Sequence, residues 1–538
     1  MIMSPRRWLA PIVSMLLLVV AFVVAIDATE GLTQPVETDF FRDMGAAQAL
    51  LDRNALGDPA YVGEIRWYNP LVPALVAGIH QLSGVPLSVL FTKSGPYLNL
   101  LTPIALLSLG WVFFGAWPAI ASLAGYLFLG SHTLPSYAHA TYSPWLWPAN
   151  FSPALFLLTL LAYQRHCTRP DWWTATITGF LLGACALAHT GPALIGASVI
   201  ALSTANWIRI GQWPWKRGLI DLSLIAAVAM LISAPFLAPL IRVYGFEIVH
   251  PAPLQFSGIS LGQMLRDLAS PRFAIALLGV IALGRRARRE PLTYGIRIWL
   301  YFAVVALAWL TLTVAASHLS FLGQALPAYH FHIYFKLAEC MLFGVGCWVV
   351  AVWLSARPWS RWKAPVWCAV MITLLVVTAM PGYLRRPDFV DFPRASRRFA
   401  EHPSVGPLYH WALENSRPSD VFIAADPMLA LFSIAAAGRK LVAMPVLFSN
   451  PYVDYGVRWR DQEAMRSILS VQSNQPLSAF RRLANQYDVT FVVARQPVRG
   501  VDTFLHLEIA AGDVAVYRYD ALALSNVLSS FESSDARN

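Results

Sequence analysis

Charged residues are scarce in this chain of 538 residues, since only 13% are Asp, Glu, Lys or Arg while 57% are hydrophobic. Soluble domains contain about 25% charged and about 45–50% apolar residues. The shortage of charge therefore excludes an ordinary soluble globular protein. Because apolar runs of about 15–25 residues recur along the chain, we expect an integral membrane protein that crosses the bilayer as helices.

Cysteine is also scarce, and all of its copies lie in or beside apolar segments. The five cysteines are Cys167, Cys185, Cys340, Cys347 and Cys368. None falls in the two long polar regions, 27–96 and 381–538, so we predict no disulfide framework. No Cys/His spacing typical of a metal site occurs either.

The net charge of +10 is explained by the loops between apolar runs. Basic residues concentrate in the cytoplasmic loops of membrane proteins, so the charge gives no reason to expect a nucleic-acid partner. Alternate short loops are basic, at 165–169, 209–217, 285–297 and 357–363. The short loops that we assign to the outer side contain no Lys or Arg, at 131–147 and 317–330. This asymmetry predicts a cytoplasmic N-terminus and an extracytoplasmic C-terminal region.

About eleven apolar runs are long enough, or nearly so, to cross a bilayer core about 30 Å thick. They lie near residues 8–26, 97–115, 117–133, 148–164, 173–189, 190–206, 219–243, 273–284, 297–316, 335–355 and 364–380. The first run follows Arg6 and Arg7, as a signal peptide would. We interpret it as an uncleaved helix, because Trp8 to Ile26 is long enough to span and no small-x-small cleavage site follows.

The chain changes character after residue 380, where charge rises and long apolar runs end. Four segments rich in Val, Ile and Phe predict strands: DVFIAA, KLVAMPV, DVTFVVAR and DVAVYRY. Three others predict helices: GPLYHWALENS, MLALFSIAAAG and EAMRSILSV. Gly438 fits an ordinary helix stop rather than a phosphate loop. We therefore expect an all-α transmembrane domain over 1–380 and an extracytoplasmic α/β domain over 381–538.

The loop at 27–96 is too long and polar for a simple connection between two membrane helices. It carries acidic residues at Glu37, Asp39, Asp43, Asp52, Asp58 and Glu64, among others. A long polar loop in an otherwise apolar chain favours function over connection. We expect the rest of the protein to hold this loop against the outer face of the membrane.

Within this loop, Thr38 is a plausible N-cap for a helix that begins near Asp39. One face of this helix would be apolar, with Phe41, Met44, Ala47 and Leu51. The opposite face would carry Asp39, Arg42 and Asp43. One interpretation is an interfacial helix with solvated charges. The other is a carboxylate pair tuned by an arginine in a cleft beside the membrane.

The protonation state of Asp39 depends on opposing effects. The helix N-terminus and Arg42 both favour its ionised form, whereas burial disfavours it. Further along the loop, Trp67 and Tyr68 suit the lipid headgroup layer. The proline-bounded apolar segment that follows them is too brief to span, and we predict a re-entrant or interfacial helix.

Seven of the 12 histidines map to the predicted outer side. They are His132, His139, His189, His250, His318, His330 and His332. Each can be a hydrogen-bonded interfacial histidine, and together they can line a polar cavity. A metal site is a third interpretation, but no ligand spacing supports it.

Charged residues at the ends of predicted membrane helices are the next candidates. Lys336 and Glu339 lie three residues apart at the start of a helix, where charges are usually paired or functional. Lys336 could contact a lipid phosphate, or the two could form an ion pair with Lys336 reaching towards the interface. Arg242, Arg266 and Arg272 flank the loop at 244–272 and could also contact a phosphate.

In the order and composition of its segments the chain resembles the GT-C glycosyltransferases. These are multi-spanning enzymes that take a sugar from a polyprenyl-phosphate carrier at the non-cytoplasmic face. One helix is followed by a long outer loop with an early acidic motif, Glu37-Thr38-Asp39-Phe40-Phe41-Arg42-Asp43. That loop ends in Tyr-Asn-Pro-Leu at 68–71, and about ten spans and an outer domain follow.

The resemblance implies roles for residues at matching positions. Asp39 would be the general base on the acceptor hydroxyl, with Asp43 as the second catalytic candidate. Lys336 would stabilise the departing phosphate. The substrate-binding candidates are Arg42, Glu64, Tyr68, His139, His189, Arg242, His330, His332, Lys336 and Glu339.

The sequence also departs from known members of this superfamily. Residues 131–147 contain no Asp or Glu, and the tail has no Trp-Trp-Asp, unlike oligosaccharyltransferase-like members. The acidic motif lacks the Asp-Glu pair of mannosyl- and aminoarabinose-transfer relatives. We therefore expect no cofactor or bound metal, and the acceptor stays open between a glycan, a lipid and a protein.

Our hypothesis is a glycosyltransferase that uses a lipid-phosphate-linked sugar, in what we expect to be a bacterial inner membrane. One alternative is a transporter or lipid flippase, which predicts charges near mid-bilayer on broken helices and internal repeats. Another is a non-catalytic membrane scaffold whose tail binds a partner. The charges of this chain cluster near helix ends instead, which favours the enzyme.

Overall fold

The structure is a computed structural model. It describes residues 8–130, 135–254, 262, 266, 270–318, 326–358, 360–495 and 498–535, without the side chains of 317, 318 and 531–535. Arg6, Arg7, His132 and the side chain of His318 therefore lie outside the described residues.

The chain forms two compact units. Unit 1 comprises Met1–Leu32, Thr92–Pro235 and Leu254–Arg394, and unit 2 comprises Thr33–Phe91, Phe236–Pro253 and Ala395–Asn538. Most of the long polar loop thus packs in the same unit as the tail. The domain boundary expected at residue 380 stays a prediction, while the compact packing divides the chain at Arg394.

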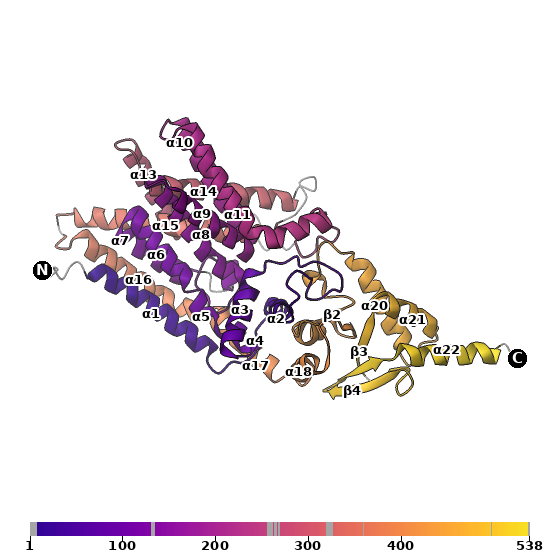
Figure 1. The fold of residues 1–538 in the computed structure, drawn as a ribbon. Coiled ribbons are helices and arrows are strands. Elements are labelled where there is room, and N and C mark those ends of the chain that lie inside the picture. The colour runs from indigo at the N-terminus through magenta and orange to yellow at the C-terminus, as the bar shows by residue number, and fades with distance from the viewer. Residues whose placement is uncertain are drawn as a thin grey trace. The chain divides into compact units, whose positions relative to one another are not determined.

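Unit 1 is a bundle of helices, and a helix overlies each of the eleven apolar runs (Figure 1). These helices are α1 (Leu9–Thr29), α5 (Gly95–Leu98) with α6 (Leu101–Phe114), α7 (Ala116–Phe128), α8 (Pro148–Thr168), α9 (Trp172–Ala188), α10 (Thr190–Arg209), α11 (Trp215–Tyr244), α13 (Pro271–Ala287), α14 (Tyr294–His318), α15 (Ala328–Ser355) and α16 (Ala364–Tyr383). Two further pieces are η2 (Ser136–Ala138) and α17 (Pro387–Ala400), whose last residues belong to unit 2.

Length and hydropathy allow seven spans within the described residues, or eight if one bent pair is counted. The bent pair is α3 (Leu71–Ser83) and α4 (Leu87–Lys93), whose axes differ by 118°. Such a break is typical of a re-entrant segment or a broken span. The chain is therefore an integral membrane protein, with fewer qualifying spans than the eleven expected because several helices are short or less apolar. The re-entrant or interfacial helix expected after Tyr68 stays a prediction.

Helix α15 forms the centre of unit 1, packed along α7, α13, α14 and α16. Glycines allow the close approach: a Cβ on Gly344 would overlap the carbonyl oxygen of Pro118, and one on Gly346 would overlap that of Ile275. Small residues let membrane helices pack backbone against backbone.

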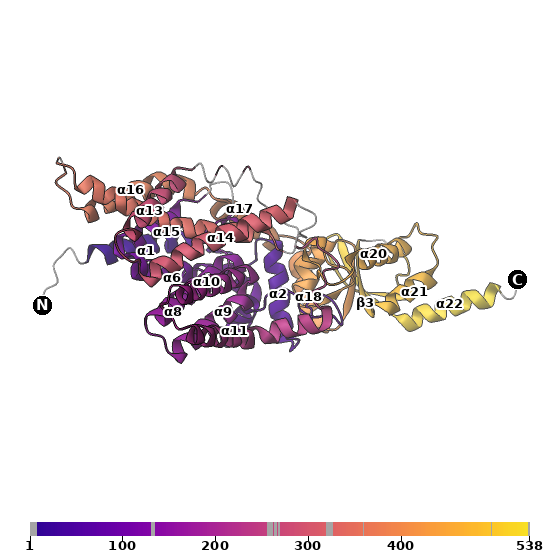
Figure 2. The same ribbon diagram turned by 90° about the horizontal axis from the view of Figure 1, so that it is seen from above.

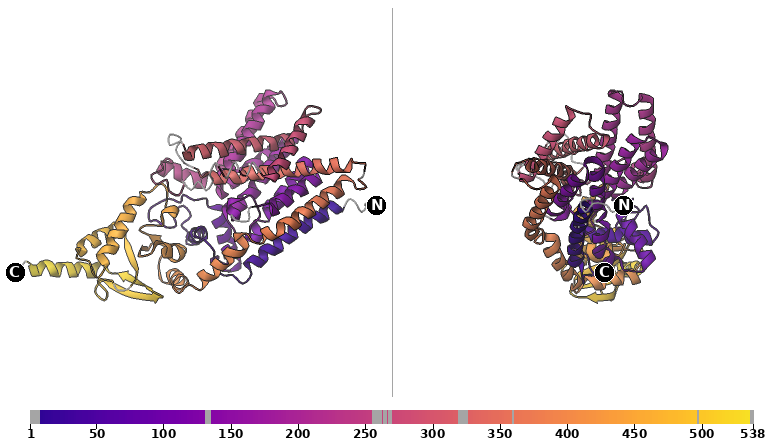
Figure 3. Two further views of the ribbon diagram at one scale, coloured as in Figure 1. Left: turned by 180° about the vertical axis from the view of Figure 1, so that it is seen from behind. Right: turned by 90° about the vertical axis from the view of Figure 1, so that its left-hand side faces the viewer.

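Unit 2 combines the loop helices with the tail. Besides α3 and α4 it contains α2 (Thr38–Leu51), α18 (Val405–Asn415), α19 (Pro427–Ala430), the π-helical turn η4 (Leu431–Ala435), η5 (Val446–Phe448), α20 (Tyr455–Leu469), α21 (Leu477–Gln486) and α22 (Ala521–Asp535). The helical stretch before Gly438 ends as predicted, because Gly438 adopts φ +72°. Helix α22 leads away from the sheet to the C-terminus (Figure 3).

The tail holds a five-stranded sheet in the order β2-β1-β3-β5-β4. Its strands are β1 (Val421–Ala424), β2 (Lys440–Leu441), β3 (Val489–Arg495), β4 (Leu505–Ala511) and β5 (Val514–Tyr519). β1 pairs in parallel with β2 and β3, whereas β5 pairs antiparallel with β3 and β4. The α/β tail is confirmed, and all four predicted strands are present. β4 was not predicted; most of its residues are exposed, although Leu505, Leu507 and Ile509 alternate along it as in a strand.

Helices cover both faces of this sheet, with α18 and α20 on either side of β3 (Figure 2). On one face Trp411 of α18 contacts Phe422 and Phe491 edge-on. On the other face, Ile423 and Val492 share a core with residues of α20 and α21. Alternate strand residues thus point to opposite cores, which fixes the register.

Candidate functional site

Helix α2 is held in unit 2 through its apolar face. Phe41 packs against Phe399 and Phe432, with ring centres 5.1 and 4.9 Å away. A Cβ on Gly45 would overlap the carbonyl oxygen of Ala435, so only glycine permits this approach. The predicted cap is wrong: Thr38 is the first helical residue, because Glu37 is still extended and occupies the N-cap position.

The three charged residues of α2 form one cluster. Arg42 Nη1 lies 2.9 Å from Asp39 Oδ1, and Arg42 Nη2 lies 2.8 Å from Asp43 Oδ1. The side chain of Asp43 is 1% exposed and that of Arg42 10%, whereas that of Asp39 is 40% exposed. The expectation that these residues share a face is confirmed. The solvated-charge interpretation is wrong for Arg42 and Asp43, because the surrounding loop and tail bury them.

Tyr68 completes the clamp around Arg42. Its ring centre lies 3.6 Å from the guanidinium carbon, and the ring of Phe448 lies 6.0 Å away. A guanidinium over an aromatic face is attracted to the ring's negative centre. Ion pairs and ring contact together fix Arg42, which in turn orients the carboxylate of Asp39.

Burial sets the electrostatics of this cluster. It raises the pKa of Asp43 to about 6, although Arg42 opposes the shift. Burial also lowers the pKa of Arg42, but the charges around it, Asp43 first, outweigh this and hold its pKa above the usual range. Asp43 Oδ2 is buried and has no hydrogen-bond partner among the described residues. A carboxylate with a raised pKa suits proton transfer near neutral pH.

A small cavity lies beside the cluster, with a volume of about 20 Å³. It is lined by Arg42, Asp43, Ala46, Asp58, Pro59, Ala60, Arg66, Trp67, Tyr68, Asn69, Pro70, Met444 and Phe448. Such a volume admits about one water molecule or one hydroxyl group. A sugar ring would have to stay outside it.

Arg66 lines the same cavity and was not identified from the sequence. It is 4% exposed, and Nε and Nη1 have no hydrogen-bond partner among the described residues. Burial lowers its pKa to about 10, so it stays charged at neutral pH. A lone arginine in a polar loop carries no periodicity, and its position next to Trp67 and Tyr68 was the one available signal.

Other acidic loop residues anchor the loop to the tail. Asp58 accepts hydrogen bonds from the backbone of Ala60 and Tyr61 and from Asn450 Nδ2. Asp52 Oδ2 lies 2.8 Å from Arg439 Nη1. These carboxylates therefore have structural partners within unit 2.

Glu64, a substrate-binding candidate, is also part of this anchoring. It accepts a hydrogen bond from the Tyr244 hydroxyl at 2.8 Å and pairs with Arg458 at 3.3 Å. Arg242, on the same helix as Tyr244, is exposed. Substrate contacts by Glu64 and Arg242 stay predictions.

Four of the histidines predicted to lie on the outer side meet in two pairs within unit 1. The rings of His189 and His330 are 4.3 Å apart, and those of His139 and His332 are 6.4 Å apart. His250 lies in unit 2 instead, where its ring stacks on Tyr455. The predicted polar cavity lined by histidines stays a prediction.

The charges on α15 form a buried group in unit 1. Glu339 accepts from Arg272 Nε at 3.1 Å and Nη2 at 3.0 Å, and Lys336 Nζ lies 3.5 Å from Glu339. The expected ion pair of Lys336 and Glu339 is confirmed, and Arg272 joins it. Arg266 Nε donates to the carbonyl of Gly262. A phosphate contact by Lys336 stays a prediction.

The described residues contain no group of three or more His, Cys, Asp or Glu side chains that could hold a metal ion. The expectation that the protein uses no metal or cofactor stays a prediction.

Comparisons with known proteins give matches among solved structures alone. No protein-family profile and no curated protein matches the chain. The oligosaccharyltransferase of Archaeoglobus fulgidus, tethered to an acceptor peptide, matches at 12% identity and TM-score 0.54, over 91% of this chain and 70% of its own. ArnT from Cupriavidus metallidurans, bound to undecaprenyl phosphate, matches at 12% identity and TM-score 0.53, over 95% of this chain and 98% of its own.

A second structure of the archaeal enzyme, with an inhibitory peptide and a dolichol-phosphate, is similar at 11% identity and TM-score 0.54, over 90% of this chain and 69% of its own. Identities this low establish the fold alone. The GT-C fold expected from the sequence is confirmed, with its helical membrane domain and a small C-terminal sheet domain.

Proposed function

We propose that this protein is a membrane glycosyltransferase that moves a sugar from a polyprenyl-phosphate donor to an acceptor hydroxyl on the extracytoplasmic face. The observation that carries the proposal is the Asp39–Arg42–Asp43 cluster, in which a buried guanidinium holds a half-exposed carboxylate. The lipid phosphates bound to similar folds, undecaprenyl phosphate and dolichol-phosphate, support the class of donor.

Asp39 is the general base in this proposal. Its carboxylate is accessible, so it can take the proton of the acceptor hydroxyl as the oxygen bonds to the anomeric carbon. The bond from the anomeric carbon to the carrier oxygen breaks, and the lipid phosphate leaves as an anion. Asp43 orients Arg42 and is the second candidate for the base, because its free oxygen faces a cavity of hydroxyl size.

Cations near the leaving oxygen would stabilise its charge. Lys336 keeps this role in the proposal, since its ammonium is buried beside Glu339 on α15. Arg66 is a second candidate, because it offers two guanidinium nitrogens without protein partners among the described residues. No metal or cofactor enters the proposed reaction.

The test uses purified full-length protein in proteoliposomes with polyprenyl-phosphate-linked sugars and candidate acceptors. Asp39→Asn should lower transfer by about 10²–10⁴-fold, the usual contribution of a general base. Glu414→Gln, which alters an exposed carboxylate on α18 of the same unit, is the matched control and should transfer normally. Unchanged transfer by Asp39→Asn removes Asp39 from the mechanism.

The same vesicles distinguish the alternative functions. Movement of the lipid-linked sugar across the bilayer without any product would favour a flippase. Neither product nor movement by the wild type with any donor would favour a scaffold. In both cases the enzyme proposal fails.

A further inference from the structure

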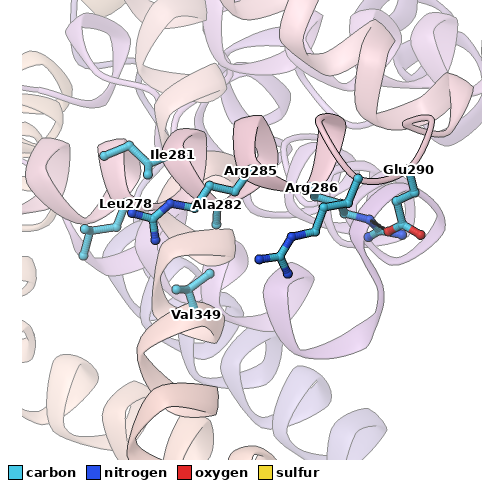
Figure 4. Close-up of a pocket in the computed structure, with 8 residues that line it drawn as sticks. Leu278, Ile281, Ala282, Arg285, Arg286, Glu290 and Val349 are labelled. Carbon is cyan, nitrogen blue, oxygen red and sulfur yellow. Dashed lines mark hydrogen bonds and ion pairs between the residues drawn. The ribbon is translucent and has the colours of Figure 1, made fainter.

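Unit 1 contains a larger pocket at the end of α13, far along that helix from Arg272. Its volume is about 590 Å³. It is lined by Leu278, Ile281, Ala282, Arg285, Arg286, Arg289, Glu290 and, from α15, Val349. Figure 4 shows Val349 on its own helix, facing the side chains of α13.

The pocket follows from how α13 and α15 pack. The two helices touch backbone to backbone at Gly279 and Gly346, where an added Cβ would overlap Leu342 and Ile275 carbonyls. One turn further along each helix come Ala282 and Val349. These side chains are too small to fill the space that opens there, so the pocket forms between the helices.

The polar side of the pocket is cationic. Arg285, Arg286 and Arg289 are exposed, and Glu290 pairs with Arg286 (Figure 4). Among the described residues no carboxylate pairs with Arg285 or Arg289. Two guanidinium groups are therefore available for an anion, and guanidinium matches phosphate geometry with two parallel hydrogen bonds.

The other side of the pocket is apolar and open to the surroundings. Leu278 is 44% exposed and Ile281 43% exposed. Helix α13 has 17 residues, so it extends about 25 Å from its first residue to its last. If α13 crosses a hydrocarbon core about 30 Å thick, the arginines at its C-terminal end would lie near one headgroup layer and Leu278 and Ile281 at acyl-chain depth.

We propose that this pocket binds the phosphate headgroup of an anionic bilayer phospholipid, whose acyl chain lies along Leu278 and Ile281. Basic pockets between membrane helices suit such headgroups. A free phosphate would leave the apolar wall unused, and a zwitterionic lipid would place its own cation beside the arginines. The site does not depend on the proposed transferase activity.

Arginines at a helix end also arise from the rule that sets membrane orientation, without any lipid site. The experiment must therefore separate a pocket from a general basic surface. Val349→Trp keeps every charge but places a bulky indole ring inside the pocket. Arg285→Gln/Arg289→Gln keeps the volume but removes the two available cations.

The test is native mass spectrometry of the full chain released from micelles that contain phosphatidylglycerol, with phosphatidylcholine as the neutral comparison. Wild-type protein should retain phosphatidylglycerol in preference to phosphatidylcholine. The double arginine variant should bind it roughly 30-fold more weakly, since each arginine near a lipid surface contributes about fivefold. Val349→Trp should lose it as well. Arg165→Gln/Arg169→Gln, another exposed basic pair, should behave as wild type.

Three results would overturn the proposal. Equal retention of phosphatidylcholine would remove the anionic preference. Wild-type binding by Val349→Trp would show a surface charge effect without a pocket. Full displacement by millimolar inorganic phosphate or glycerol phosphate would show a site for soluble anions. Because the two variants perturb different properties, loss in both with unchanged thermal unfolding separates binding from misfolding.

Discussion

The ring of Tyr68 lies flat against Arg42, with 3.6 Å between the guanidinium carbon and the ring centre. This contact joins helix α2 to the segment that precedes α3. The residues between these two pieces include Asp58, Pro59 and Ala60, which line the cavity. The contact also limits where the guanidinium can turn, which keeps Asp39 in one orientation.

Replacing Tyr68 should loosen α2 without unfolding the chain. Tyr68→Leu removes a cation–π contact worth about 0.5–2 kcal/mol, so amide exchange over 38–51 should become about fivefold faster. Tyr68→Phe keeps the ring and should exchange as wild type. Equal exchange in all three proteins would mean that the ion pairs alone hold Arg42.

The free energy of unfolding of the chain should depend on pH through the titration of Asp43. Its pKa rises from 3.8 to about 6 on folding, so the folded state binds more protons between these values. Stability contributed through Asp43 therefore increases as pH falls from 7 to 4, by up to roughly 3 kcal/mol. Asp43→Asn cannot titrate.

The measurement is the thermal unfolding midpoint of full-length protein in detergent, as the difference between wild type and Asp43→Asn. The wild type should gain on the variant as pH falls through about 6. A difference that is constant from pH 4 to 8 would show that Arg42 keeps Asp43 ionised throughout.

Two glycines provide a matched pair for the packing of the loop. Gly45→Ala forces a methyl group against the carbonyl of Ala435 and should destabilise by about 1–3 kcal/mol. Gly78→Ala, on α3, meets nothing within 4 Å and should stabilise by about 0.5–1 kcal/mol. Thermal unfolding midpoints test both variants. A shift of the same sign in both midpoints would refute the close approach of Gly45 to Ala435.

Arg66 should matter more for transfer than for stability. Arg66→Met removes a buried charge whose Nε and Nη1 lack partners among the described residues, so the unfolding midpoint should stay level or rise. Transfer should fall on the order of 100-fold if the guanidinium stabilises the departing phosphate. Arg482→Met, exposed on α21, should change neither quantity. A lowered midpoint with normal transfer would assign Arg66 a structural role.

The sequence was sufficient for the membrane bundle because a span is a local property. Each long apolar run must become a helix, and β1, β3 and β5 of the tail are marked by their Val, Ile and Phe content. The candidate site is different. The period of α2 leaves open whether its charged face is solvated or enclosed in a cleft. Asp43 is buried, and the cavity beside it is closed in part by Phe448 of the tail, which no local pattern relates to α2.

Arg66 is a second residue whose place in the candidate site could not be predicted from the sequence. Arg66 is buried, its Nε and Nη1 lack partners among the described residues, and it lines the same cavity as Asp43. All three properties result from the folding of an irregular loop. No helical or strand period marks such a residue. The short motif at 37–43 indicated where the candidate site lies, but the cavity and its second arginine required coordinates.

The ion pair of Asp52 with Arg439 has a consequence for biosynthesis. The partners are 387 residues apart. At about 5–20 residues per second, Arg439 is made roughly 20–80 s after Asp52. Until then Asp52 lacks Arg439, and Phe448 is absent from the cavity beside Asp43. A chain truncated before Arg439 should therefore lack these tail contacts, whereas the contacts of Arg42 with Asp39, Asp43 and Tyr68 lie within the loop.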